Sequence, residues 1–265
     1  DYAWSDIGSD LPKKVELNNL KPVDNKLIEA AYKLLLKPNS MLYLGGKFLD
    51  EECLKFAAQI ATKTGCRLVT DTFVSRIRRG AGLPIVQQVP YFSEMAEDFL
   101  QGTESIVFIG TKPPVSFFAY PDKKSFLSPD EAELFQLCSV EEDGHEALAL
   151  LSELSGSPKI ANELIRPYIS DVPTSGDLDV TTLGPLIADI MPEDSIVSDE
   201  SATSSLIVTP HALQAKPHDW LALTGGSIGQ GLPLAIGASI AKPDRPVITL
   251  HGDGGAMYTV QALWT

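Results

Sequence analysis

The sequence predicts an α/β protein made of two three-layer α/β units with mainly parallel sheets, the second of them truncated. Short apolar runs alternate along the chain with longer segments whose apolar residues recur every three or four positions, which is the pattern of buried parallel strands joined by helices. Between residues 152 and 177, five glycines and prolines interrupt this alternation before it resumes. Two covered sheets joined by an irregular connection satisfy both observations.

In the first unit, residues 25–37 carry apolar side chains at the spacing of a helix with one buried face. The apolar run Met41–Leu44 predicts a strand that ends at Gly45-Gly46. Asp50 is placed to cap the next helix, and Gly65 is suited to end it in the left-handed conformation. The other elements predicted in this unit are a strand at Arg67–Thr70, a helix near Ser93–Gln101 and a strand at Ser105–Ile109.

The second unit repeats the alternation of helices and strands. Its predicted elements are a helix near Thr181–Met191, a strand at Ser195–Ser198, a polar turn, a strand at Trp220–Leu223, a helix near Leu232–Ala241, a strand at Pro246–His251 and a helix over Ala256–Thr265. The last helix stops without a glycine, asparagine or proline signal, so we expect the sequence to be part of a longer chain.

Composition and charge exclude several classes of protein. The 265 residues include 21 basic and 35 acidic side chains, which gives a formal net charge of −14. Nucleic acids and anionic membranes require clustered basic residues, and the short run Arg76–Arg79 is too small to supply them. Cys53, Cys66 and Cys138 lack metal-ligand spacing and cannot all pair. With no secretory pattern and no membrane-spanning apolar run, the sequence predicts a cytoplasmic protein without nucleic-acid or membrane partners.

Three loops follow strands of the second unit, at Asp199–Ser204, Thr224–Gly231 and Gly252–Gly255. Ligands of parallel sheets bind beyond the carboxyl ends of the strands, so these loops are the candidate site. The four glycines of the second loop permit close approach of a ligand, although the G-x-G-x-x-G spacing of dinucleotide loops is missing. In the third loop, Asp253 between glycines suits a Mg²⁺-bridged diphosphate.

Each loop also has a plain structural alternative. The hydroxyl and carboxylate side chains of the first loop are ordinary helix caps. The second loop could be a glycine-assisted turn in which Ile228 fills the core, and Asp-Gly in the third is a common turn pair. Among the histidines, we expect His145 at the surface and His251 packed at a strand end rather than in catalysis.

Taken in order, the three loops resemble those of the thiamine diphosphate-dependent 2-oxoacid enzymes, a family that includes acetolactate synthase, benzoylformate decarboxylase and pyruvate decarboxylase. The motifs D-E-S-A-T-S, G-G-S-I-G and G-D-G-G, the last followed by Q-A-L-W-T, carry this resemblance. It implies a lead-in linker over residues 1–24, a Rossmann-like central domain over 25–150, an interdomain linker over 151–177 and the N-terminal part of a diphosphate-binding domain over 178–265.

The resemblance also implies roles for individual residues. Asp253 would ligate Mg²⁺, and Ile228 would be an apolar wedge that holds the cofactor bent. Gly226 would meet the aminopyrimidine with its backbone. The full set of implied cofactor-binding residues is Ala202, Thr203, Gly226, Ser227, Ile228, Gly252, Asp253, Gly254, Gly255 and Ala256.

Parts of the family's active site are expected outside this segment. The glutamate that activates the cofactor belongs to the N-terminal domain, and the asparagine that completes the metal site follows G-D-G by about two dozen residues in the pattern of the family. We therefore expect no catalytic residue within 1–265 and an inactive fragment, whereas the complete protein would act as a homodimer or homotetramer with shared active sites.

Two positions bear on which member of the family the sequence resembles. Val89 stands where benzoylformate decarboxylase has a histidine, which counts against that substrate. Gly45-Gly46-Lys47 is the single candidate for a flavin-contacting loop, so FAD is not expected. The leading hypothesis is an acetolactate synthase-like decarboxylase or carboligase acting on a 2-oxoacid. The alternatives are an oxidoreductase that binds FAD or NAD and a non-catalytic relative that serves as a subunit.

Overall fold

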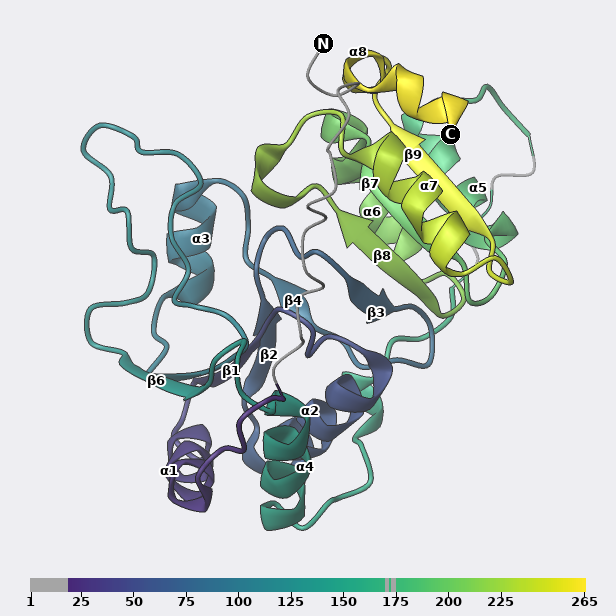
Figure 1. Ribbon diagram of the computed structural model, residues 1–265. Coiled ribbons are helices and arrows are strands. Elements are labelled where there is room, and N and C mark those ends of the chain that lie inside the picture. The colour runs from purple at the N-terminus through teal and green to yellow at the C-terminus, as the bar shows by residue number, and fades with distance from the viewer. Residues whose placement is uncertain (1–18, 170–171, 173–174) are drawn as a thin grey trace, which may run out of the picture.

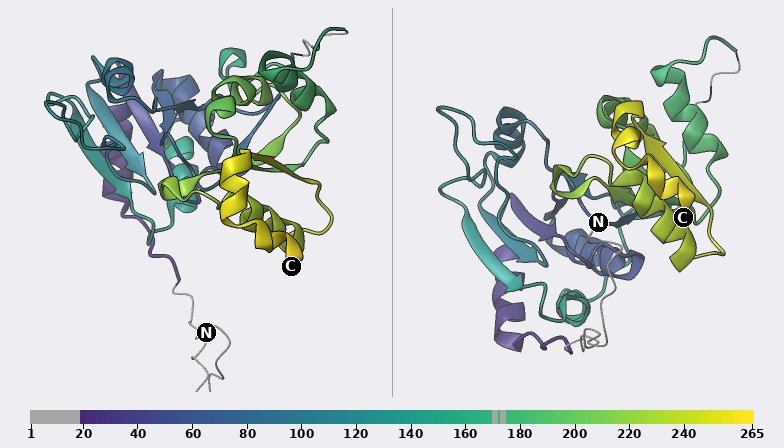
Figure 2. Two further views of the ribbon diagram at one scale, coloured as in Figure 1. Left: turned by 90° about the horizontal axis from the view of Figure 1, so that it is seen from above. Right: turned by 45° about the horizontal axis from the view of Figure 1, so that its top comes forward.

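The computed structural model describes residues 19–169, 172 and 175–265, and it contains the two α/β units that the sequence predicts (Figure 1). The first sheet has the strand order β4-β2-β1-β5-β6, and the second has the order β3-β8-β7-β9. The two sheets lie side by side, each with helices packed against it (Figure 2). Within the described residues, no helix reaches the length and apolar character that crossing a bilayer requires.

All strands of the first sheet run parallel. The central strand β1 is buried at every position, as expected for a strand with helices on both sides. The strands are β1 (Ser40–Leu44), β2 (Arg67–Thr70), β4 (Gln87–Gln88), β5 (Ser105–Ile109) and β6 (Glu133–Cys138).

Alternate residues of β1 enter two different hydrophobic clusters. Leu42 and Leu44 belong to the cluster that includes side chains of α1 (Asn25–Leu35), α2 (Glu51–Thr64) and α4 (Gly144–Leu154). Met41 and Tyr43 belong to the cluster that includes α3 (Ser93–Leu100). The sheet is therefore the middle of three layers.

The predicted caps of α2 are confirmed. The Asp50 carboxylate accepts hydrogen bonds from the N–H groups of Glu52 and Cys53, each at 3.0 Å. Gly65 ends the helix with φ 78°, where a side chain would be strained. These two residues fix both ends of the helix that connects β1 to β2.

The second sheet combines three parallel strands with one antiparallel strand. The parallel strands are β7 (Ile196–Glu200), β8 (His218–Ala222) and β9 (Val247–His251), with β7 in the middle. The antiparallel strand β3 (Ile77–Arg79) pairs with β8, although it lies between β2 and β4 in the chain. A segment that follows a strand of the first sheet thus forms an edge of the second sheet.

Ion pairs and apolar contacts fasten β3 in place. Arg76 pairs with Asp219 at 2.9 Å, and Arg78 pairs with Asp194 at 2.7 Å. Ile77 belongs to the same hydrophobic cluster as side chains of α2 and as Val197 of β7. The basic run at residues 76–79 is therefore occupied in joining the two units.

Helices cover both faces of the second sheet. Helix α7 (Gly231–Ala241) packs on β7 and β9, in front of the sheet in Figure 1, while α6 (Ser205–Ala212) lies behind it against α5 (Val180–Ile190). The chain ends with α8 (Asp253–Tyr258) and the 3-10 helix η5 (Val260–Trp264). Further 3-10 segments within the described residues are η2 (Asn162–Leu164), η3 (Ala202–Ser204) and η4 (Thr224–Gly226).

Several predicted elements need correction. The predicted polar turn after β7 is wrong, because this segment contains α6, whose helical pattern is hidden by Pro210 and by polar residues around it. The predicted final helix starts at Asp253 rather than Ala256 and is broken at Thr259, where φ is −136°. Helix α4 and the strands β3, β4 and β6 are not among the predicted elements. Three of the six residues of β6 are exposed, because it is an edge strand, so it has no continuous apolar run.

Candidate functional site

The three predicted loops meet at one edge of the second sheet. Strands β8, β7 and β9 are neighbours and run parallel, so their carboxyl ends lie together. Strand β7 extends two residues beyond its predicted end at Ser198, so the first loop starts with the last residues of the strand, Asp199 and Glu200; the second loop follows β8 and the third follows β9. Connections leave the middle strand β7 toward β8 and then pass back across it to β9, which is the arrangement that places ligand sites in open α/β sheets.

The first loop is held by the carboxylate of Asp199. This carboxylate accepts hydrogen bonds from the N–H and hydroxyl groups of Ser201, at 3.0 Å and 2.6 Å, and from the hydroxyl group of Ser205 at 2.6 Å. Ala202 and Thr203 are exposed. Ala202 has φ 51°, a left-handed conformation that is costly for alanine and that is found most often at functional sites.

The second loop presents its apolar residue to the outside. Ile228 is 58% exposed, so the alternative in which it fills the core is wrong. Gly226 and Ser227 are also exposed. Gly226 has φ 67°, and a Cβ built on it would lie 3.1 Å from the ring of Phe117. The loop therefore borders the first unit on one side and leaves Ile228 free on the other.

The third loop leaves its backbone open. Asp253 is exposed as the first residue of α8. A Cβ built on Gly254 meets no atom of the described residues within 4 Å, and one on Gly252 lies 3.8 Å from its nearest neighbour. Internal packing therefore does not require glycine at these two positions, and the space beside them is open to a ligand. At Gly255, a Cβ would lie 2.9 Å from a carboxylate oxygen of Glu200, and Ala256 is half-buried.

A buried pair that sequence reasoning missed lies beneath these loops. The Nε2 atom of His251 is 3.2 Å from a carboxylate oxygen of Glu200, and the two side chains are 7% and 5% exposed. His251 packs at the end of β9, as predicted. Glu200 stood within the first predicted loop without an assigned role, because its partners are 29 to 51 residues away and spacing in the sequence gives no signal for them.

Asp253 is the candidate metal ligand of the site, and it has no complete set of ligating side chains around it within the described residues. Among the described residues, no cluster of three or more His, Cys, Asp or Glu side chains could hold a metal ion. Asp253 is a hard oxygen ligand of the kind that Mg²⁺ prefers, with open backbone on both sides of it. This donor set fits a metal ion that takes its other ligands from a bound diphosphate and from elsewhere.

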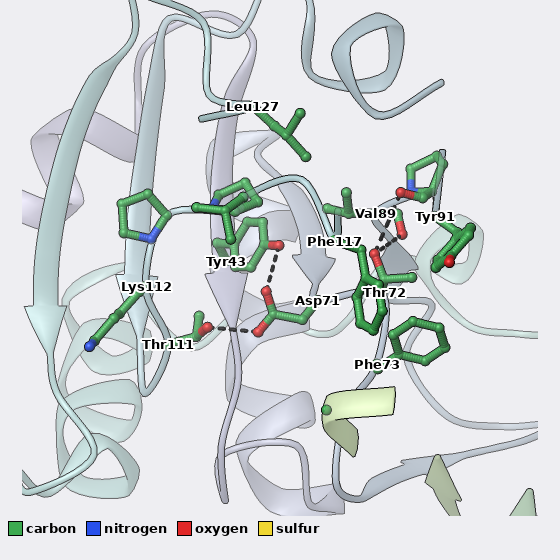
Figure 3. A pocket seen from close by; sticks show the side chains of 15 residues that line it. Tyr43, Asp71, Thr72, Phe73, Val89, Tyr91, Thr111, Lys112, Phe117 and Leu127 are labelled. Atoms are coloured by element: carbon green, nitrogen blue, oxygen red, sulfur yellow. Dashed lines mark hydrogen bonds between the residues drawn. The ribbon is translucent and has the colours of Figure 1, made fainter. Parts of the chain in front are cut away.

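A pocket at the carboxyl edge of the first sheet adjoins the site. Its volume is about 300 Å³, and Gly225 of the second loop forms part of its wall. Figure 3 shows the Asp71 carboxylate between two hydroxyl donors, Tyr43 at 2.9 Å and Thr111 at 2.7 Å. Burial raises the pKa of Asp71 against the lowering effect of these hydrogen bonds. The aromatic rings of Phe73, Tyr91 and Phe117 line the same pocket.

Sequence comparisons identify relatives of the chain. Residues 202–265 match the model of the thiamine pyrophosphate enzyme C-terminal TPP binding domain. The protein named "Putative acetolactate synthase large subunit IlvX" of Mycobacterium tuberculosis is 39% identical over 227 residues, or 85% of this chain and 43% of that protein. Benzoylformate decarboxylase of Pseudomonas aeruginosa is 29% identical over 180 residues, or 63% of this chain and 34% of that protein.

The fold comparison agrees with the sequence comparison. The 4-hydroxybenzoylformate decarboxylase of Rhodococcus jostii, a thiamine diphosphate-dependent protein, superposes with a TM-score of 0.69 at 23% identity, covering 94% of this chain and 50% of that one. The chain thus spans half or less of the length of these relatives. Loop order and the sequence comparisons lead to one conclusion, with which the fold agrees: the chain is a relative of part of the thiamine diphosphate-dependent enzymes that include acetolactate synthase and benzoylformate decarboxylase.

Proposed function

We propose that the full-length protein is a thiamine diphosphate- and Mg²⁺-dependent enzyme that decarboxylates a 2-oxoacid, uses it in carboligation, or does both, in the manner of an acetolactate synthase. One observation carries this proposal. In and directly before the region matched by the TPP-binding family, three loops with exposed residues meet at the carboxyl edge of β8, β7 and β9. The described segment supplies the diphosphate side of the site.

The third loop would hold the diphosphate and the metal ion. Asp253 would ligate Mg²⁺, and Gly252, Gly254, Gly255 and Ala256 would surround the diphosphate, with the backbone N–H groups of Gly254 and Gly255 facing the phosphate oxygens. The open space beside Gly252 and Gly254 supports this role. Ala202 and Thr203 would contact the phosphates from the loop after β7.

The second loop would orient the organic part of the cofactor. Ile228 is an exposed apolar side chain between glycines, which suits a wedge beneath the two rings. Gly226 and Ser227 would meet the aminopyrimidine through their backbone. When bound, thiamine diphosphate supplies the electron sink that allows a 2-oxoacid to lose CO₂, and the protein contributes its position and electrostatics.

Other parts of the active site would come from outside this segment. We propose that an upstream glutamate activates the cofactor, that residues 1–265 alone are inactive, and that the whole protein is a homodimer or homotetramer. The three cysteines are buried and free within the described residues, which supports a reducing compartment such as the cytoplasm.

Calorimetric titration of the full-length protein with thiamine diphosphate and Mg²⁺ tests the proposal. We expect saturable binding that requires Mg²⁺ and that Asp253→Ala weakens by at least about tenfold, the equilibrium equivalent of one lost metal–carboxylate contact. Asp244→Ala is the matched control, because Asp244 is also an exposed aspartate and lies in the turn before β9. Absence of binding, or binding that Asp253→Ala leaves unchanged, contradicts the proposal.

The same preparation separates the alternatives. Release of CO₂ from a panel of 2-oxoacids, measured in the presence of cofactor, supports the enzyme. Cofactor binding without CO₂ release from any of them supports a non-catalytic subunit. Tight binding of NADH or FAD without thiamine diphosphate supports the oxidoreductase.

A further inference from the structure

The carboxylate of Glu200 lies where the three loops of the candidate site converge. One of its oxygens accepts the N–H group of Gly229 at 2.5 Å, and the other accepts the N–H group of Gly231 at 2.6 Å. The side chain is 5% exposed, so water does not compete for these bonds. A single carboxylate at the end of β7 thus fixes two backbone positions of the second loop.

Glu200 is tied to the third loop as well. Its backbone carbonyl accepts the N–H group of Gly252 at 3.0 Å, and its carboxylate is 3.2 Å from Nε2 of His251. The space for this arrangement depends on glycine. A Cβ on Gly255 would lie 2.9 Å from the Glu200 carboxylate, and a Cβ on Gly231 would lie 2.7 Å from the His251 ring.

The second and third loops also hold each other. The carbonyl group of Gly229 accepts a hydrogen bond from the Thr259 hydroxyl at 2.6 Å, while its N–H group is bound to Glu200. Its φ is 92°, and a Cβ at this position would lie 2.9 Å from Cβ of Tyr258. Gly229 is therefore clamped between the end of β7 and the segment after α8.

We propose that Glu200 is a positioning residue that fixes Ile228 and Asp253 relative to each other before the cofactor binds. Glu200 would touch neither the cofactor nor the metal ion, and it would act through the backbone of Gly229 and Gly231. A loop that is already held in its binding geometry loses less conformational entropy when the ligand arrives, so affinity rises. The effect on affinity rests on the proposed function, whereas the effect on the loop does not.

The test uses Glu200→Gln in the full-length protein. The amide oxygen of Gln can accept one of the two N–H groups, but its NH₂ group faces the other, so one buried N–H loses its acceptor. The matched control is Glu52→Gln. Glu52 also lies beside a histidine, His145, at 3.1 Å, but the side chains of this pair are 66% and 43% exposed and lie on the first unit.

Two measurements are made on each protein. The first is amide hydrogen exchange over residues 225–231 without cofactor, where we expect at least about tenfold faster exchange in Glu200→Gln and no change in Glu52→Gln. The second is the Kd for thiamine diphosphate at saturating Mg²⁺, which we expect to rise about tenfold in Glu200→Gln alone. At saturating cofactor, kcat should return to within about threefold of the wild type, because the reacting groups are untouched.

Each result decides one part of the inference. Wild-type exchange over residues 225–231 in folded Glu200→Gln overturns it, and so does faster exchange with an unchanged Kd, which would leave Glu200 a purely structural role. If the wild type itself binds no thiamine diphosphate, the proposed function fails. The exchange data still test whether Glu200 holds the loop of residues 225–231 in place. If Glu200→Gln does not fold, His251→Gln replaces it. This variant should accelerate exchange over residues 252–256 and raise the Kd, and a wild-type result in it overturns the inference.

Discussion

The guanidinium carbon of Arg79 lies 3.6 Å from the centroid of the Trp220 ring, which joins β3 to the neighbouring strand β8 by a cation–π contact. Arg79 is 4% exposed, and burial lowers its pKa to about 9. Its Nε and Nη2 atoms have no hydrogen-bond partner among the described residues. The face of the guanidinium group thus stacks on Trp220, while two of its three nitrogen atoms lack hydrogen-bond acceptors among the described residues.

Substitution of Arg79 separates these two effects. Arg79→Met keeps the volume against Trp220 and removes the unpaired N–H groups, so we expect the free energy of unfolding to stay equal or rise by about 1 kcal/mol. Arg79→Ala should lower it by about 2–4 kcal/mol, because it leaves a cavity in the contact between the units. Urea unfolding of the full-length protein measures both. A large loss of stability in Arg79→Met would show that the guanidinium charge itself is required.

The buried His218 makes stability depend on pH. Burial, followed by the nearby charge of Arg79, lowers its pKa from 6.5 to about 4. Because the folded state binds this proton more weakly than the unfolded state, stability is complete above about pH 6.5 and declines as the pH falls toward 4, by up to about 3 kcal/mol. Urea unfolding at pH 7 and pH 4.5 measures the decline. His218→Gln should reduce it, whereas His145→Gln at the exposed pair should leave it as it is.

The left-handed Ala202 predicts an unusual response to glycine. An alanine-to-glycine change inside a helix costs about 1 kcal/mol. At φ 51°, glycine also relieves backbone strain, so Ala202→Gly should leave the free energy of unfolding unchanged or raise it by about 0.5 kcal/mol. Ala30→Gly, in the middle of α1, is the control that should show the ordinary loss. Chemical unfolding curves of the two variants measure these free energies. An equal loss of unfolding free energy in both would contradict backbone strain at Ala202.

Two neighbouring glycines of the third loop should respond differently to alanine. A Cβ at Gly254 enters open space, so Gly254→Ala should change stability by less than about 0.5 kcal/mol and weaken thiamine diphosphate binding. At Gly255, the added Cβ presses on Glu200 and His251, so Gly255→Ala should cost about 1–3 kcal/mol even without cofactor. Thermal unfolding with and without thiamine diphosphate distinguishes the two. Normal cofactor affinity in Gly254→Ala would place the diphosphate elsewhere.

The sequence predicts best the elements whose stability is local or whose burial is complete. Met41–Leu44 and Ser105–Ile109 are apolar on both faces, and Asp50 and Gly65 mark the ends of α2 by their own chemistry. Strand β3 could not be predicted, because its three residues, an isoleucine and two arginines, are too few to show a strand pattern. It becomes a strand by pairing with β8, about 140 residues further along the chain.

The candidate site divides in the same way. Its three loops were predicted because each carries its signal in a few adjacent residues, and the topology of β8, β7 and β9 brings them together. The cofactor roles of individual residues, Asp253 and Ile228 among them, stay predictions. The Glu200–His251 pair could not be read from the sequence, since its contacts exist once parallel strands align the ends of β7 and β9.

The position of β3 limits how this molecule can be divided. Expression of residues 178–265 alone would remove β3 and leave the backbone N–H and C=O groups of β8 unpaired along one side. An open strand edge of this kind is a template for pairing with other chains, so such a fragment should aggregate rather than fold as a small binding module. Any functional dissection of the second unit therefore has to carry residues 76–79 with it.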